Sequence, residues 1–525
     1  MYVLYLTVTI TSSIHSDVTL PGVFGDYMVL QRDMKVPVWG TAEPGEKVSV
    51  SINGKKVDTK AEKNGRWMVR LKKMKAGGPY EMTVTGKNRV SFSNVLIGDV
   101  WVCSGQSNMA MTIDRVRHIE ADIAEAHYDK LRYFSAGYGI SETPLYDFAR
   151  EGITWTSCTP ETVKKFSAVA FYFGKELQSE LDVPIGLMNA SVGGTVLEAW
   201  MSRESLKSDP LLLPIIYYWD DIRENWPEIK AKYDFEVAEW EKAKEQGQWV
   251  PDPPQSPRGP SSSAFYSCLY NAMITPMIPY GIKGVIWYQG ESNTVRAWQH
   301  RTQFPVMIHS WRKEWNQGDF PFLFVQLPNW EAETWPIHGR NVTWAEMRES
   351  QLQTLSVPNT GMAVTIDIGD EYNAHPNNKW DVGRRLALSA LHTAYGREII
   401  YSGPIYDSMK VDGNAIRLSF KHVGDGLVAS DDAPLKGFTT AGKDRVFFEA
   451  TAKIEGDEVV VTCEKVPNPV AVRYGWDDNP ECTLCNSAHL PASPFRTDDW
   501  PGMTDGMLIP YNRHDLYFWY PTVIR

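Results

Sequence analysis

The sequence predicts an α/β protein in which a parallel sheet is flanked by two β-sandwich-like domains. Residues 17–96 hold short alternating runs broken by turns, residues 97–400 alternate continuous apolar runs with helical segments, and residues 401–525 return to β patterning. A length of 525 residues agrees with about three domains, because single hydrophobic cores stop growing at about 250–300 residues.

Composition narrows the class of protein. A hydrophobic content of 43% and a charged content of 22% are ordinary for a globular chain. The net charge of −11 argues against nucleic acid and anionic membranes, which require a clustered basic face. The 20 tryptophans and 24 tyrosines exceed what packing usually needs, and sugar-binding clefts are one common reason. We therefore expect neither a nucleic-acid nor a membrane partner, and composition sets no oligomeric state.

The first 16 residues begin with an apolar run over residues 2–10. This run is too short to span a bilayer and lacks the basic flank and small-residue cleavage site of a signal peptide. Residues 1–16 are therefore either the remnant of a secretory signal or a first strand.

Residues 17–96 read as a small β-sandwich. The dipeptide Asn53-Gly54 between two alternating runs predicts a tight hairpin, because both residues tolerate positive φ. The predicted strands are Val36–Gly40, Lys47–Ile52, Trp67–Leu71 and Tyr80–Thr85.

Residues 97–400 predict a parallel sheet with helices on both faces, since its strands are continuously apolar. A charged insertion at about 206–263 interrupts the alternation with one or two exposed helices and a proline-rich loop; it is either a lid or decoration. The predicted strands are Val100–Val102, Val183–Asn189, Gly284–Tyr288, Phe320–Leu327 and Met362–Ile366.

Residues 401–525 return to β patterning and end in a tail. Six cysteines are too few for a disulfide scaffold. Cys482, Cys485 and His489 resemble half a zinc site, but no second pair follows at ligand spacing, so loop packing or a local disulfide is expected and no metal. The predicted strands are Ala415–Phe420, Val446–Ala450 and Val459–Cys463.

Four candidate site residues each follow shortly after a predicted strand: Ser107, Gly193, Glu291 and His375. In open parallel sheets the functional site lies beyond the carboxyl ends of the strands, so these residues are expected to share a pocket. A nucleophilic serine needs a base, donors for the oxyanion and a turn that exposes its oxygen. Ser107, directly after the turn at Gly105, is the candidate nucleophile.

His375 is the candidate general base. It lies in a polar loop after the strand Met362–Ile366 and before a helical run, where an imidazole would reach a serine on a neighbouring loop. Gly193 lies in a Gly-Gly turn that offers backbone N–H groups for the oxyanion, and the side-chain amides of Gln289 and Asn293 are further candidate donors.

Taken together, these segments resemble the sialate O-acetylesterase family of SGNH hydrolases. The resemblance implies a flavodoxin-like, three-layer SGNH catalytic domain between β domains, and hydrolysis of acetyl esters on sugars without a metal or other cofactor. Shorter matching segments before residue 105 and after residue 379 extend the resemblance to most of the chain. The matching blocks are Gly-Gln-Ser-Asn-Met (105–109), Gly-Gly-Thr-x-x-Glu-Ala-Trp (193–200), Trp-Tyr-Gln-Gly-Glu-Ser-Asn (287–293) and His-Pro-x-x-Lys (375–379).

The sequence departs from this pattern at the acid of the triad. Many SGNH hydrolases carry Asp three residues before the histidine, where this chain has Tyr372, and members of this family often carry it two before, where this chain has Asn373. Asp370 in the same loop and Glu291 from another loop are the candidates for orienting the imidazole; Asp367 is also nearby. A Ser–His dyad is the further possibility.

The expected function is hydrolysis of O-acetyl groups on a carbohydrate such as sialic acid, xylan or xyloglucan, by an acyl-enzyme route. A non-catalytic carbohydrate-binding protein and a general short-chain acyl or aryl esterase are the alternatives. The family's usual role and the apolar start of the chain favour a periplasmic or secreted location.

Overall fold

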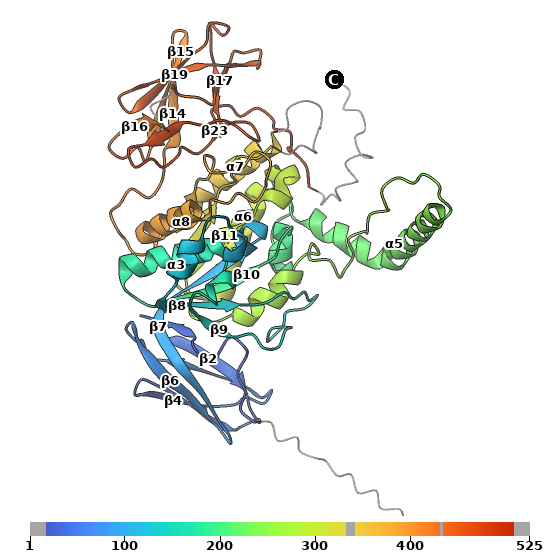
Figure 1. The fold of residues 1–525 in the computed structure, drawn as a ribbon, viewed down its shortest axis with the longest axis vertical. Coiled ribbons are helices and arrows are strands. Elements are labelled where there is room, and N and C mark those ends of the chain that lie inside the picture. Colours follow the sequence, from blue (N-terminus) through green and yellow to red (C-terminus); the bar gives the residue numbers. More distant parts are fainter. Residues whose placement is uncertain (1–16, 332–341, 431–433, 509–525) are drawn as a thin grey trace, which may run out of the picture.

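The computed structural model describes residues 17–331, 342–430 and 434–508. Figure 1 shows three regions stacked along the long axis: a β region from the start of the chain, an α/β region in the middle, and a second β region from the end of the chain. Residues 1–16, for which a signal remnant or a first strand was expected, lie outside the described residues.

The middle region is built on a mostly parallel sheet, as predicted. Its strands follow the order β13-β12-β11-β7-β10-β8-β9, and every pair is parallel except β8–β9 at one edge. The strands are β7 (Arg89–Gly105), β8 (Tyr128–Ser135), β9 (Trp155–Cys158), β10 (Ile185–Ser191), β11 (Gly284–Tyr288), β12 (Phe322–Val325) and β13 (Thr360–Ala363).

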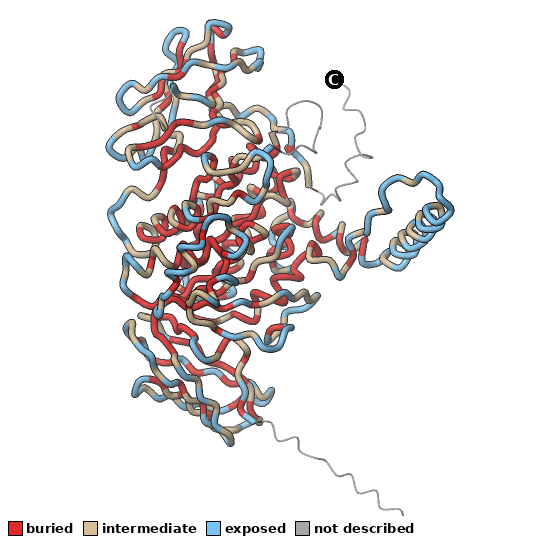
Figure 2. The backbone as a smooth tube through the Cα atoms, in the orientation of Figure 1, coloured by how far each residue is buried: buried red, intermediate tan, exposed pale blue. Residues whose placement is uncertain are grey.

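Both faces of this sheet are buried, because alternate residues of each strand enter different cores. In β7, Val100 and Val102 belong to one core, whereas Trp101 and Cys103 belong to the other. The continuous apolar runs in the sequence therefore mark strands covered on both sides. Helix α6 (Ala297–Trp315) contributes to the first core, and α3 (Ala168–Leu181) and α8 (Lys379–Thr393) to the second. Figure 2 shows the buried backbone concentrated here.

The first β region contains two sheets and shares a strand with the middle region. The Asn53-Gly54 hairpin is confirmed, since Ile52 pairs with Lys55. Strand β7 pairs with β6 and β1 in its first half and with β10 and β11 in its second half, so no linker separates the regions at residue 96, and the domain limits stay a prediction. The remaining strands are β1 (Val29–Gln31), β2 (Val36–Thr41), β3 (Lys47–Ile52), β4 (Lys55–Lys60), β5 (Arg66–Leu71) and β6 (Gly77–Thr85).

The insertion forms one long helix, α5 (Leu213–Glu245). Its buried residues all lie in the first part of the helix and end at Ile222, and the rest projects from the body as an arm (Figures 1 and 2). Within the described ranges, no helix combines the length and the apolar character needed to cross a membrane. The other helices are α1 (Ser107–Ala110), α2 (Glu120–Ala124), α4 (Arg203–Lys207) and α7 (Thr343–Gln353).

The second β region holds two four-stranded sheets and a two-stranded pair, β16–β22, around a separate core that includes Tyr474 and Phe495. One sheet follows the order β14 (Ile405–Asp412), β15 (Ala415–Lys421), β20 (Glu458–Thr462) and β19 (Thr451–Glu455). The other follows β18 (Phe447–Glu449), β17 (Phe438–Ala441), β21 (Ala471–Tyr474) and β23 (Phe495–Arg496), while the pair is β16 (Leu427–Ala429) and β22 (Leu484–Asn486).

Candidate active site

The register of the parallel sheet brings three loops together. Gly105 at the end of β7 pairs with Ser191 at the end of β10 on one side and with Tyr288 at the end of β11 on the other. The three strands therefore stop at the same level, and the chain segments that follow them meet at the carboxyl edge of the sheet. Ser107 follows the first strand and Gly193 the second.

A close backbone approach explains the turn before Ser107. Gly105 has φ +136°, and a methyl group there would lie 2.1 Å from the carbonyl oxygen of Tyr288, so only glycine fits. The next residue, Gln106, donates its backbone N–H to the same carbonyl at 2.9 Å. Helix α1 begins at Ser107, which places this serine two residues beyond the end of the buried strand.

His375 lies beside Ser107. Its Nε2 atom is 2.7 Å from Ser107 Oγ, within hydrogen-bond distance. The loop between β13 and α8 is held locally, because His375 donates its backbone N–H to Asn373 Oδ1 at 2.9 Å. Desolvation, together with the positive charge of Lys379, lowers the pKa of His375 below its usual value of 6.5. The imidazole therefore stays neutral, the form that accepts a proton, to a lower pH.

A buried polar network lies directly behind this pair. Asn108, next to the serine, donates from Nδ2 to Glu291 Oε1 at 2.7 Å and to the carbonyl of Ala374 at 2.9 Å. Its Oδ1 accepts a hydrogen bond of 2.6 Å from Lys379 Nζ. Burial lowers the pKa of Lys379 to about 7, and burial raises the pKa of Glu291. The structure thus brings Glu291 into contact with Asn108, while no described contact joins it to His375.

Gly193 packs against the serine. A methyl group at this position would lie 3.3 Å from Ser107 Cβ, tighter than ordinary van der Waals contact. The neighbouring Gly194 has φ +70° and open space around it, so it supplies the left-handed turn instead. The Gly-Gly turn therefore combines close approach at one residue with backbone freedom at the next.

The amides of Gln289 and Asn293 lie deeper than the sequence suggested. Gln289 Nε2 donates to Asn293 Oδ1 at 2.6 Å and to the carbonyl of Thr195 at 3.3 Å. Asn293 Nδ2 donates to Glu198, which also forms a 2.6 Å ion pair with Arg296. These side chains are almost completely buried. In this geometry they brace the loops that carry the site, because their hydrogen bonds go to the interior.

The two aspartates before His375 have other partners. Asp367 forms a bidentate ion pair with Arg385, with both distances at or below 2.7 Å. Asp370 accepts the backbone N–H of Tyr372 through Oδ1 at 3.0 Å. Among the described residues, no hydrogen bond reaches Nδ1 of His375. The structure therefore brings Ser107 and His375 together without placing Asp370 on the imidazole.

Sequence reasoning missed Asn108 and Lys379 as site residues, and Glu198 as the centre of the supporting network. All three were present in the motif blocks that carried the resemblance. A lysine in a polar loop ordinarily faces solvent, whereas Lys379 is fully buried. Its burial is a property of the tertiary fold, so apart from its place in the His-Pro-x-x-Lys block nothing in the sequence marks it.

The cysteine motif does not form a metal site in the described part of the chain. No disulfide joins Cys482 to Cys485, and with His489 they line a cavity of about 660 Å³. No group of three or more metal-binding side chains lies together in the described ranges. The expected local disulfide is absent from the described cysteines, and Cys485 lies in strand β22 rather than in a loop.

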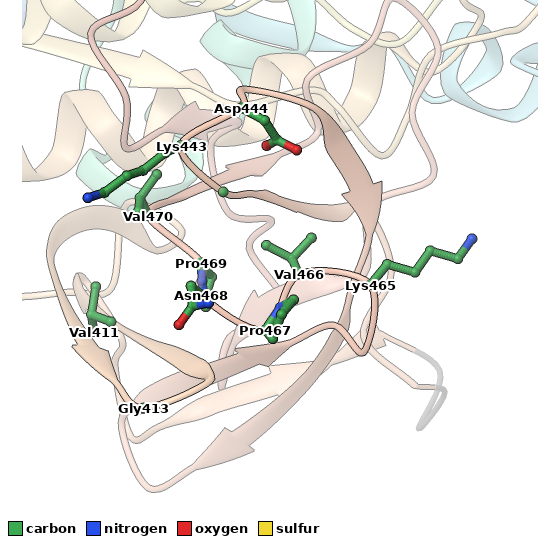
Figure 3. A pocket seen from close by; sticks show the side chains of 11 residues that line it. Val411, Gly413, Lys443, Asp444, Lys465, Val466, Pro467, Asn468, Pro469 and Val470 are labelled. Carbon is green, nitrogen blue, oxygen red and sulfur yellow. The ribbon is translucent and has the colours of Figure 1, made fainter.

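A pocket of about 410 Å³ in the second β region lies between loops (Figure 3). The amines of Lys443 and Lys465 point to opposite sides, so its polar groups do not converge on one point. Its lining residues include no serine, histidine or cysteine. Ligand sites usually place a few polar groups together, and acyl transfer through a hydroxyl or thiol nucleophile with an imidazole base needs a serine or cysteine and a histidine, so the catalytic candidates stay at the carboxyl edge of the sheet.

Comparison with known proteins identifies the family of this chain. Residues 97–212 and 240–392 match the family described as carbohydrate esterase, sialic acid-specific acetylesterase, and these ranges contain both Ser107 and His375. The chain is therefore a carboxylic ester hydrolase, as the sequence predicted. It belongs to the sialic acid-specific acetylesterase family of carbohydrate esterases.

Relatives cover almost the whole chain. A sialate O-acetylesterase from Mus musculus is 31% identical over 513 residues, and one from Homo sapiens is 30% identical over 519; each alignment spans 90% of this chain and 92% of the relative. The crystal structure of a carbohydrate acetylesterase from Xanthomonas citri superposes with a TM-score of 0.80 at 38% identity, covering 92% of this chain and 100% of that one. The predicted resemblance is confirmed.

Proposed function

We propose that this chain removes O-acetyl groups from carbohydrates through an acyl-enzyme at Ser107. The observation that carries the proposal is the 2.7 Å separation between Ser107 Oγ and His375 Nε2 at the carboxyl edge of the sheet. Membership of a carbohydrate esterase family supports the choice of an ester bond and a sugar. A serine hydroxyl within hydrogen-bond distance of an imidazole is the pair that nucleophilic catalysis with a general base needs, which supports the proposal.

The proposed reaction has two halves. His375 takes the proton of Ser107 as its oxygen attacks the acetyl carbonyl, and the backbone N–H groups of Ser107 and Gly193 hold the oxyanion. The sugar oxygen leaves with the proton from His375, and the acetyl group stays on Ser107. Water then attacks the acetyl-serine, His375 accepts a proton from it, and acetate leaves as the serine recovers its hydrogen.

The pair works as a dyad in this proposal, with Asp370 and Glu291 as the alternatives for an orienting acid. Both hydrogen bonds described for their carboxylates go to other groups. In this proposal, the amides of Gln289 and Asn293 do not contact substrate but stabilise the loop after Gly193 through hydrogen bonds to Thr195 and Leu197. This assigns direct contact with substrate to Ser107, His375 and Gly193.

Replacement of the nucleophile tests the proposal. Ser107→Ala should lower acetate release by several powers of ten, since nucleophile and base act as a unit. Ser191→Ala is the matched control, because that serine ends the neighbouring strand in register with Gly105. Retained turnover in Ser107→Ala, with an intact fold by circular dichroism, would refute the mechanism.

The substrate within this class is proposed as an acetylated sialic acid or a plant polysaccharide such as xylan or xyloglucan. Acetate release from acetylated xylan, xyloglucan, mannan and sialic acids would identify it. A general acyl or aryl esterase predicts rates that rise with acyl length, whereas an acetyl pocket loses rate beyond about propionyl. Sugar binding by calorimetry without any acetate release would favour the carbohydrate-binding alternative.

We also propose the finer fold assignment, a flavodoxin-like, three-layer SGNH domain. Taken in chain order, β7, β10, β11, β12 and β13 occupy the spatial order 2-1-3-4-5, with β8 and β9 added at one edge. This is the flavodoxin-like order, in which ligands bind at the point where the strand order reverses, here between β7 and β11. A periplasmic or secreted location is proposed from the family's usual role, and cell fractionation tests it.

A further inference from the structure

We infer that Lys379 is a positioning residue of the esterase. It fixes the side chain of Asn108, and Asn108 in turn holds the loop that carries His375 against helix α1, which begins at Ser107. The inference rests on the proposed roles of Ser107 and His375. Lys379 is the first residue of α8, four positions after His375, and it is fully buried. Burying an ammonium group is costly, so the contacts of Lys379 indicate why this lysine is in the interior.

A buried ammonium is expensive unless it is paired and hydrogen-bonded. Lys379 Nζ donates to Asn108 Oδ1 at 2.6 Å and lies 5.7 Å from the centre of the Tyr288 ring, whose face attracts cations. The carboxylate of Glu291 is the opposite charge that faces it. On its own helix, Asp381 is held by Asn378 at the helix N-terminus.

The amide of Asn108 connects this charge pair to both halves of the site. Its oxygen accepts from Lys379, so its nitrogen must donate, and it donates to Glu291 and to the carbonyl of Ala374. Asn108 directly follows Ser107, and Ala374 directly precedes His375. One side chain therefore fixes the spacing between nucleophile and base, and Lys379 fixes the orientation of that side chain.

Replacing Lys379 by methionine keeps an unbranched side chain but removes the ammonium. We expect Lys379→Met to lower kcat by about 10²-fold, the cost of misplacing reacting groups by about 1 Å, with little change in KM. Removing the cation near His375 also raises the pKa of the imidazole, so the acidic limb of kcat/KM should move to higher pH.

Lys283→Met is the matched control. Lys283 is half-buried, lies 4.7 Å from the ring centre of Tyr395 and has its pKa lowered by burial, yet it precedes β11 at the opposite end of the sheet. It should leave kcat and the acidic limb unchanged. Equal losses in both variants, or wild-type kcat and an unmoved limb in Lys379→Met, would overturn the inference.

A second variant covers the case in which Lys379→Met does not fold. Asn108→Ala removes the same contact and should then lower kcat to a similar extent, and an unchanged kcat would overturn the inference. Where both single variants fold, the double variant should lose no more than either single one, because both act through the same contact. Additive losses would overturn the inference. Ser107→Ala separates it from the proposed function: inactivity there with a fully active Lys379→Met refutes the inference alone, whereas turnover in Ser107→Ala refutes the mechanism itself.

Discussion

The imidazole of His375 lies 2.7 Å from the hydroxyl of Ser107, although 268 positions separate the two residues in the chain. The parallel sheet makes this contact possible, because the loops that leave its strands on one edge converge whatever their distance in sequence. A third residue, Asn108, ties the two loops together through the carbonyl of Ala374.

The pH dependence of activity should reflect the lowered pKa of His375. Because desolvation and the charge of Lys379 lower this pKa, the neutral base persists below pH 6.5, and the acidic limb of kcat/KM should lie below that value. Asn373→Asp adds a negative charge beside His375, which raises its pKa and should move the limb upward.

The control for this charge substitution is Asn64→Asp. Asn64 accepts the backbone N–H of Arg66 two residues on, the same local contact that Asn373 makes with His375, but in the first β region. The acidic limb of kcat/KM in Asn64→Asp should match that of the wild type. An unmoved limb in Asn373→Asp would show that the base in the profile is another group.

Three substitutions of a carboxylate by an amide test whether an acid orients His375. Asp370→Asn should cost less than about tenfold in kcat, because its carboxylate holds the backbone of Tyr372, whereas loss of a true orienting acid costs about 10³ to 10⁴. Asp367→Asn should mainly lower the melting temperature by breaking the pair with Arg385. A loss of about 10³ to 10⁴ in kcat in Asp370→Asn would assign the acid to that residue and exclude the dyad. The same loss in Glu291→Gln would assign it to Glu291 only where it exceeds the loss in Asn108→Ala, because Glu291 also holds Asn108.

Two neighbouring glycines should separate activity from stability. Gly193→Ala places a methyl group 3.3 Å from Ser107 Cβ and should lower kcat by about tenfold or more, with a small change in melting temperature. Gly194→Ala meets no atom within 4 Å but forces alanine to φ +70°, so it should cost about 1 kcal/mol of stability and little kcat. A loss of kcat in Gly194→Ala with little change in Gly193→Ala would contradict this prediction, because it would mean that Gly194 is the glycine that approaches Ser107.

The buried pair of Glu198 and Arg296 should dominate the local stability of the site. Glu198→Ala leaves Arg296 charged and unpaired in the interior, and we expect a loss of about 3–5 kcal/mol in urea unfolding. Glu204→Ala, in the exposed pair with Lys207, should lose less than about 1 kcal/mol. Similar losses in the two variants would mean that Arg296 finds other partners.

Local patterning predicted about half of the described strands. The Asn53-Gly54 turn lies where expected, and β11 has the predicted bounds, because turn chemistry and apolar runs act between near neighbours. Strand β13 ends at Ala363, earlier than the apolar pattern suggested, since Val364 and Ile366 are buried in the loop toward His375. Periodicity reports burial, and burial extends beyond the strand.

The sequence by itself determined the family and singled out the serine and the histidine that meet at the carboxyl edge of the sheet, because each is written in a short contiguous block. Only the tertiary structure decided which polar side chains face the reaction and which are internal braces. Gln289 and Asn293 turn inward to Thr195 and Glu198, and Lys379 is buried against Asn108. Such partners come from distant segments, and the desolvation that gives a buried charge its altered pKa exists only once those segments have packed.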